Sequence, residues 1–333
     1  MLIDNARVPE VSDLFEAQKR VSGVVKKTPL LENPLLNEIT GKRIFVKAEC
    51  LQTTGAFKFR GAWSALTFLT ESQRKNGVLA YSSGNHAQAV AYAAALLKTK
   101  ATIIMPNDAP KLKLDNTRAY GAEVVLYDRP GGEDREAIGR RIAAEQGSIL
   151  IKPYDNTQVI AGQGTCGLEI ADQLQERNIE DPEVLACCGG GGLTAGIALA
   201  FEDKLPGTSV RPVEPEHYDD VCRSLQDHRR LSVDTQEHSI CDAIVTPSPG
   251  EYTFPILDRA CAPGIAVTDT EALKAMAVAA NYFKLVAEPG GAVALAAALF
   301  HHDKLQSDTI VSVISGGNAD PALFAKALSL DPF

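Results

Sequence analysis

The chain has 333 residues, 45% of them hydrophobic and 23% charged, which is ordinary for a soluble globular protein. A formal net charge of −9 without a Lys/Arg cluster argues against nucleic acid and anionic membrane surfaces as main partners. No apolar run reaches the roughly 18 residues of a membrane span, and the start MLIDNARVPE lacks the pattern of a signal peptide. The seven cysteines include no C-x-x-C pair, so we expect reduced thiols and a cytoplasmic protein.

Short apolar runs alternate with segments of helical period along most of the chain. In chain order, strands are expected at 43–50, 77–83, 101–106, 123–128, 148–153, 183–188, 209–215 and 309–315. Near-continuous apolar strands separated by helices are typical of parallel sheets that are covered on both faces. We therefore predict an α/β fold with two lobes. The polar, irregular stretch 227–250 is expected to be an excursion over the surface.

In open α/β sheets, ligands bind in loops just after the carboxyl ends of strands. One such loop follows 183–188 and holds Gly189 to Gly192 and then Leu193. Consecutive glycines at a helix start let the backbone approach an anion and present several N–H groups to it, which predicts a phosphate site. The loop lacks the lysine of a Walker motif and the fingerprint of a nicotinamide dehydrogenase. A tight turn required by chain geometry alone is the alternative.

A second loop, GAFKFRGA at 55–62, places Lys58 between Phe57 and Phe59 near the start of a helix. A buried lysine beside cationic groups has a lowered pKa and is a good amine nucleophile toward carbonyl compounds. The alternative is a surface lysine whose stem covers apolar groups.

A third loop has the sequence Ser82-Ser83-Gly84-Asn85-His86. The Ser83 hydroxyl can carry a proton, Asn85 can donate to a ring oxygen, and the N–H groups of the helix start suit a substrate carboxylate. The alternative is a helix N-cap with a satisfied histidine.

A fourth loop, SGGN at 315–318, offers the Ser315 hydroxyl to a heteroaromatic nitrogen, although it can also be a simple turn. Together, the four loops supply what pyridoxal 5'-phosphate (PLP) needs from a protein.

The motifs GAFKFRGA, SSGNHA, GGGGLTAG and SGGN, in this order, resemble the fold-type II PLP family of serine/threonine dehydratases and serine racemases. The resemblance runs from TPL at 28–30 to SGGN. It implies a tryptophan-synthase-β-like architecture with a large PLP-binding domain, 1–74 and 152–333, and a small mobile domain, 75–151. It also implies loss of water from a small β-hydroxy amino acid such as L-serine or L-threonine, giving a 2-oxo acid and ammonia. Serine racemase and 3-hydroxyaspartate dehydratase are alternatives within the family, and a homodimer is the default assembly.

By this resemblance, each motif residue matches a role. Lys58 matches the lysine that binds the cofactor covalently, and Ser83 the proton carrier on the opposite face of the ring. The cofactor contacts implied are Phe57 on the ring face, Asn85 at the 3-hydroxyl, Gly189, Gly190, Gly191, Gly192 and Leu193 at the phosphate, and Ser315 at the pyridine nitrogen. The substrate contacts implied are Ser82, Ser83, Asn85, His86 and Arg135. Arg135 can alternatively be a charge on a helix surface.

A divalent cation is expected beside the segment 213–220. Similar family members bind one through positions that match Glu214, Asp220 and the carbonyl of Tyr218, and such hard oxygen ligands suit Mg²⁺, Ca²⁺ or Mn²⁺. The alternative is an acidic N-cap before a helix.

The chain departs from the family pattern at Cys241-Asp242-Ala243, at Glu288-Pro289-Gly290-Gly291, and at Tyr154, where racemases often have asparagine. These changes concern the cleft wall and therefore the substrate.

Overall fold

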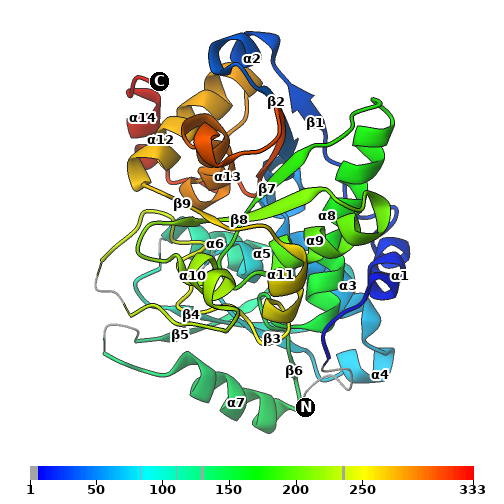
Figure 1. Cartoon of the computed structure of the whole chain (residues 1–333). Helices are drawn as coiled ribbons and strands as arrows, with labels where there is room; N and C mark the ends of the chain where they lie inside the picture. Colours follow the sequence, from blue (N-terminus) through cyan, green and yellow to red (C-terminus); the bar gives the residue numbers. More distant parts are fainter. Residues whose placement is uncertain (1–6, 83, 110, 129–130, 235–236) are drawn as a thin grey trace.

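The computed structural model describes residues 7–82, 84–109, 111–128, 131–234 and 237–333, which form two β-sheets (Figure 1). The six-stranded sheet has the order β1 (Leu30–Glu32), β2 (Arg43–Ala48), β10 (Thr309–Ile314), β7 (Glu183–Cys187), β8 (Ser209–Pro215) and β9 (Ile265–Val267). The four-stranded sheet has the order β5 (Glu123–Tyr127), β4 (Ala101–Pro106), β3 (Val78–Tyr81) and β6 (Ile149–Leu150). Among the described strands, only β1 runs antiparallel to its neighbour.

Each of the eight predicted strands contains a strand of the structure, so the predicted α/β fold is confirmed. The sequence does not predict β1 and β9, because three residues are too few to show a periodicity. The strand predicted at 148–153 is reduced to the two residues of β6.

Helices cover both faces of each sheet. They are α1 (Val11–Val21), α2 (Pro34–Thr40), α3 (Lys58–Phe68), α4 (Glu71–Arg74), α5 (Asn85–Leu96), α6 (Lys111–Ala119), α7 (Arg135–Gln146), α8 (Thr157–Gln175), α9 (Gly192–Lys204), α10 (Asp220–Asp227), α11 (Phe254–Ala260), α12 (Asp269–Val278), α13 (Pro289–Phe300) and α14 (Pro321–Leu328). Short 3₁₀ turns at Glu49–Leu51, Thr53–Gly55 and His302–Lys304, and a π turn at Ala279–Phe283, complete the regular structure.

Different helices pack on the two sheets. Helix α13 packs across β7, β8, β9 and β10, while α9 contacts the larger sheet at β7 and β8 and packs tightly on α8. In the smaller sheet, α5 contacts β3 and β4, and α7 contacts β3, β4 and β6. Helix α3 packs on both α5 and α8 and so connects the two parts. In Figure 1 the four-stranded sheet lies in the lower part of the molecule, above α7.

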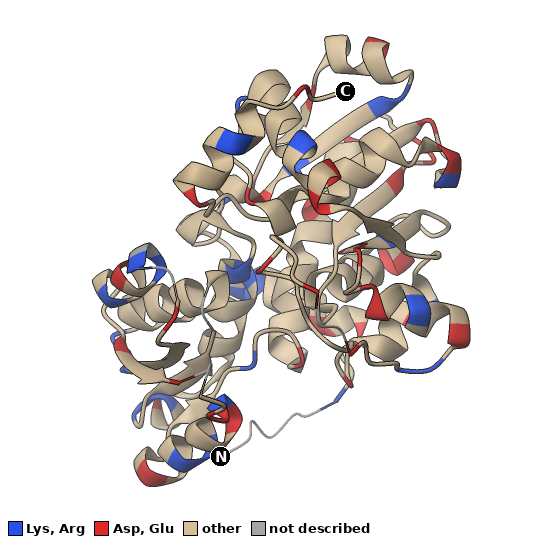
Figure 2. Cartoon of the chain, turned by 90° about the vertical axis from the view of Figure 1, so that its left-hand side faces the viewer, with Lys and Arg blue, Asp and Glu red and all other residues tan. Residues whose placement is uncertain are grey.

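The positions of basic and acidic residues are interspersed along both parts of the chain (Figure 2). None of the described helices combines the length and the apolar composition needed to cross a bilayer.

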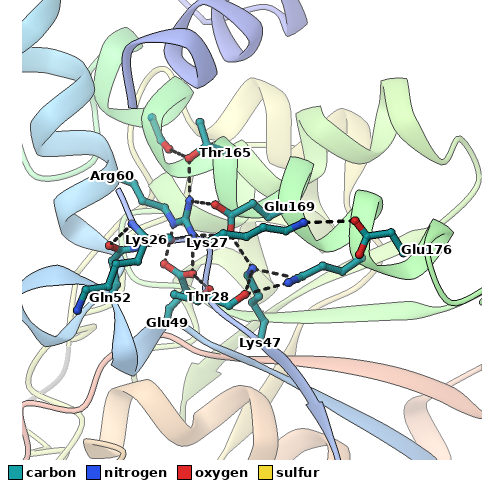
Figure 3. A network of polar contacts seen from close by, with 12 residues as sticks. Lys26, Lys27, Thr28, Lys47, Glu49, Gln52, Arg60, Thr165, Glu169 and Glu176 are labelled. Atoms are coloured by element: carbon teal, nitrogen blue, oxygen red, sulfur yellow. Dashed lines mark hydrogen bonds and ion pairs between the residues drawn. The ribbon is translucent and has the colours of Figure 1, made fainter. Parts of the chain in front are cut away.

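A buried ion network fixes the start of α3 (Figure 3). The fully buried Arg60 binds Glu49 through Nε and Nη2, at 2.7 and 2.8 Å, and Glu169 of α8 through Nη1 and Nη2, both at 2.8 Å. Lys47 of β2 donates to Glu169 at 2.7 Å. Burial alone would raise the pKa of Glu49, but Arg60 holds it below its usual range. The network therefore joins β2, α3 and α8 directly behind the turn that carries Lys58.

Replacing Glu49 by alanine should lower the free energy of unfolding by about 3–5 kcal/mol, because it leaves the buried Arg60 partly uncompensated. Glu176→Ala is the matched control: Glu176 pairs with Lys27, but both side chains are more than half exposed (64% and 56%). The control should change the free energy by less than about 1 kcal/mol. Denaturant unfolding measures both, and equal effects would contradict the assignment.

Candidate active site

A cavity of about 400 Å³ lies where the carboxyl ends of strands from both sheets meet. Its wall includes Lys58 after β2, Ser82 after β3, Tyr154 after β6, Gly189–Gly192 after β7 and Ser315 after β10. Loops from the two sheets therefore surround one space, whose size suits a small organic ligand.

The structure brings the predicted cofactor and substrate residues together in this wall. They are Phe57, Lys58, Ser82, Asn85, His86, Arg135, Gly189, Gly190, Gly191, Gly192, Leu193 and Ser315. Ser83 lies outside the described residues. Glu214, Tyr218 and Asp220 do not line the cavity.

Lys58 is the first residue of α3, and its amine faces the cavity. Its Nζ donates to the carbonyl of Pro153 at 2.7 Å and lies 5.0 Å from the ring centroid of Phe57. Desolvation in the cavity wall lowers the pKa of Lys58 to about 8. A much larger fraction of the neutral, nucleophilic amine is therefore present near pH 7 than on an exposed lysine, whose pKa is about 10.4. The Lys58 side chain therefore turns into the cavity wall, as its hydrogen bond to the Pro153 carbonyl requires, and is half-buried there.

The glycine loop passes so close to its neighbours that a side chain at several of its positions would clash with them. A Cβ on Gly190 would lie 2.3 Å from the ring of Tyr154, and one on Gly189 would lie 2.8 Å from the Thr246 hydroxyl. Gly191 has a φ of +90°, and Gly192 begins α9. Bare N–H groups at a helix start suit a phosphate.

Ser315 connects two of the loops. Its carbonyl accepts the N–H of Phe57 at 3.0 Å, and its hydroxyl accepts the Cys187 thiol at 3.1 Å. Because the hydroxyl oxygen accepts this hydrogen bond, the hydroxyl's own O–H can donate to an acceptor in the cavity. A neutral pyridine nitrogen is such an acceptor.

His86 is neutral in this environment, because burial lowers its pKa to about 3. Its Nε2 is 2.9 Å from the carbonyl of Ile151, which can only accept, so Nε2 carries the proton. Its buried Nδ1 has no hydrogen-bond partner within the described part of the chain. The cavity wall thus contains an acceptor that no described protein group uses.

Arg135 begins α7 and reaches the cavity instead of pointing only to solvent. Its guanidinium lies 5.2 Å from the ring centroid of Tyr81. None of the acids among the described residues forms an ion pair with it, so an anionic ligand would be its first charged partner.

Some lining residues, among them Tyr81 and Lys113, were missed in the sequence, whereas Asp242 and Glu288 were already expected in the cleft wall. Lys113 of α6 forms an ion pair with Asp242 at 2.6 Å, and both line the cavity together with Tyr81 and Glu288. The segment 242–248 lines it too, so the prediction that 227–250 is only a surface excursion is wrong. Because α6 follows β4, the sequence could have indicated that Lys113 lies near the carboxyl end of that strand. Its pairing with Asp242 could not be expected, because the two residues are 129 positions apart.

The expected metal ligands form a separate buried group. Glu214 accepts the N–H groups of Val221 and Cys222 at 3.0 and 2.7 Å, so it caps α10. Neither carboxylate oxygen of the buried Asp220 has a hydrogen-bond partner in the described structure. Burial raises the pKa of both carboxyls, to about 7 for Asp220. No described set of three His, Cys, Asp or Glu side chains is arranged for a metal ion, so two carboxylates and a carbonyl are the donors available.

The Tyr218 side chain takes no part in this group, since its hydroxyl donates to the carbonyl of Glu237 at 3.1 Å. Two buried acids, of which Asp220 has no described hydrogen-bond partner, nevertheless fit a hard cation.

Residues 21–316 match the family described as pyridoxal-phosphate dependent enzyme. The chain belongs to this family. It is 41% identical to the L-threo-3-hydroxyaspartate ammonia-lyase of Saccharomyces cerevisiae, over 97% of both chains. It is 39% identical to the serine racemase of Schizosaccharomyces pombe, over 98% of this chain and 99% of that protein. The crystal structure of the T.th. threonine deaminase superimposes with a TM-score of 0.88 at 44% identity, over 94% of this chain and 99% of the other. The predicted family and fold type are confirmed.

The lowered pKa of Lys58 makes a pH prediction. Reductive methylation of the cofactor-free protein should modify Lys58 half-maximally near pH 8, because only the neutral amine reacts and its fraction rises with pH. Ordinary exposed lysines should continue to gain reactivity up to about pH 10.4. Peptide mass spectrometry separates the two, and parallel curves would contradict the desolvated site.

Proposed function

We propose that this protein uses PLP, bound covalently through Lys58, to eliminate water from a small β-hydroxy amino acid such as L-serine or L-threonine. The products are a 2-oxo acid and ammonia. The observation that carries the proposal is the desolvated Lys58 amine in one cavity with the bare glycine loop and the Ser315 hydroxyl. When bound, the cofactor spreads the negative charge that is left at the substrate α-carbon.

The residues present fit this cofactor. The N–H groups of Gly189 to Gly192, with Leu193 behind them, would hold the phosphate, and Phe57 would pack against the ring. Ser315 would donate to the pyridine nitrogen, which leaves that nitrogen unprotonated and favours prompt elimination. Asn85 would donate to the 3-oxygen.

The substrate carboxylate would sit at the start of α5. Its N-cap residue, Gly84, has no side chain to occupy the first N–H groups of the helix, so they are available to an anion. Ser82, Asn85 and His86 surround this position. Lys58 would remove the α-proton, and Ser83 would serve the opposite face.

A second substrate class has a specific observation in its favour. Arg135 is a cavity cation without a described acidic partner, and it suits the second carboxylate of 3-hydroxyaspartate. The yeast relative of 41% identity is named for that substrate. Racemisation of serine is the remaining alternative and depends on Ser83.

We also propose the division of the chain into a large domain, 1–74 and 152–333, and a small mobile domain, 75–151. The strands of the four-stranded sheet all fall within 75–151. Closure of one part on the other would exclude water from the cavity between them. A cytoplasmic homodimer is the proposed working form.

Replacing Lys58 by alanine should remove the yellow colour of the purified protein and reduce kcat by at least about 10³-fold, because the covalent attachment and the proton carrier are lost together. Lys75→Ala is the matched control, since Lys75 is exposed and lies outside the cavity wall. Absorbance before and after borohydride reduction measures attachment. A yellow, reducible Lys58→Ala protein would overturn the proposal.

The substrate is decided by a panel of L-serine, L-threonine, D-serine and the 3-hydroxyaspartate isomers, assayed for oxo acid and for inversion. We expect oxo acid from at least one L-isomer. A cofactor-loaded protein that yields none would contradict β-elimination.

We further propose that Glu214, Asp220 and the Tyr218 carbonyl bind Mg²⁺, Ca²⁺ or Mn²⁺, because the cation would compensate two buried acids. At a cation concentration about a hundred times Kd, the ion should stabilise the folded protein by about 2.7 kcal/mol. EDTA should therefore lower Tm, and Asp220→Asn should remove this response. The control is Asp227→Asn at the exposed end of α10, which should keep the response. A wild-type Tm that is unchanged by EDTA and by added Mg²⁺, Ca²⁺ and Mn²⁺ would refute the site.

A further inference from the structure

Asn85 is held on both sides, by Glu288 and by Asn318. Its Oδ1 accepts from Asn318 Nδ2 at 2.7 Å, and its Nδ2 donates to Glu288 Oε1 at 2.5 Å. Asn85 is 8% exposed and Glu288 3%, and both line the cavity. The partners lie 233 and 203 residues from Asn85 in the chain.

The orientation of these amides follows from a backbone carbonyl. Asn318 Nδ2 also lies 2.9 Å from the carbonyl of Thr54, which can only accept, so the NH₂ group of Asn318 must face it. Its other N–H then requires an acceptor, which places Oδ1 of Asn85 toward Asn318. The NH₂ group of Asn85 is thereby turned toward Glu288, and one of its two N–H bonds stays free.

A glycine leaves the space that the Glu288 carboxyl occupies. A Cβ on Gly316 would lie 2.0 Å from Glu288 Oε1. The N–H of Glu288 donates to the carbonyl of Gly316 at 3.0 Å, so the carboxyl is fixed at both its backbone and its side chain. Glu288 is therefore rigidly placed against Asn85.

We propose that Glu288 is a positioning residue for the cofactor. Together with Asn318, it makes Asn85 present an N–H donor, and not its oxygen, to the 3-oxygen of the PLP ring. If Asn85 flipped, its oxygen would meet Glu288, which in its ionised form cannot donate. The inference rests on the proposed function, because it needs PLP in this cavity.

The charge of Glu288 should therefore affect cofactor binding near neutral pH. Burial raises the pKa of Glu288 to about 7, while the hydrogen bond from Asn85 and the charge of Lys113 of α6 lower it and Asp242 raises it. The other titratable groups that interact with it are the thiols of Cys50 and Cys187. Above this pKa the carboxylate holds Asn85 firmly, and below it the neutral carboxyl is a weaker acceptor. Cofactor affinity should fall as the pH drops through about 7.

The test is a PLP titration of the cofactor-free protein, followed by absorbance between pH 6 and 8.5. Glu288→Gln keeps the size of the side chain but can offer either an oxygen or an NH₂ group to Asn85. It should raise the Kd for PLP on the order of tenfold and lose the step near pH 7. Glu176→Gln, at an exposed acid outside the cavity wall, should keep wild-type behaviour. Asn318→Ala should reproduce the weaker binding.

A Glu288→Gln protein with wild-type Kd and pH dependence would overturn the inference. A Glu288→Gln protein that binds PLP more weakly but keeps the step near pH 7 would also overturn it, because a residue with a merely structural role would give that result. Thermal unfolding of each variant confirms that it is folded. A wild-type protein that fails to bind PLP at all would instead overturn the proposed function, and the inference with it.

Discussion

The candidate site depends on one partly desolvated amine. Lys58 is at the first turn of α3, half-buried, and its amine contacts the Pro153 carbonyl and the Phe57 ring. Its nucleophilicity at neutral pH exists only while that turn stays in the cavity wall, because contact with bulk water would return its pKa toward that of an ordinary lysine. The buried pairs of Arg60 with Glu49 and Glu169 join the same helix to β2 and α8, and so to the larger sheet. Stability of the fold and reactivity of the amine are therefore linked through α3.

Charged side chains differ in how they are paired at three places in the protein. Around Arg60, opposite charges are buried together and compensate each other. At Glu214 and Asp220, two acids are buried together, and none of the described cationic side chains is bound to either. In the cavity, Arg135 has a ring beside it but no described acid. Burying a charge is costly unless it is compensated, so the second place is where a ligand of opposite charge is expected.

Hydrogen bonds in the cavity have fixed directions because they end on atoms that can only accept. The carbonyl of Ile151 decides which nitrogen of His86 is protonated, and the carbonyl of Thr54 decides how Asn318 and then Asn85 face. The Cys187 thiol donates to the Ser315 oxygen, so the Ser315 O–H can donate to a ligand. A cofactor ring with several heteroatoms would meet donors and acceptors that are set before it binds, which reduces the cost of ordering them.

The sequence by itself determined the α/β fold and the loops that line the cavity, Lys58 among them, because apolar strands, glycine runs and residue types at strand ends are local features. It could not determine that Tyr154 covers Gly190, that Lys113 meets Asp242, or that Glu288 and Asn318 hold Asn85. These partners are far apart in the chain and have no periodicity that joins them. They meet only because strands from two sheets end at the same cavity, so their pairing was decided by the tertiary structure.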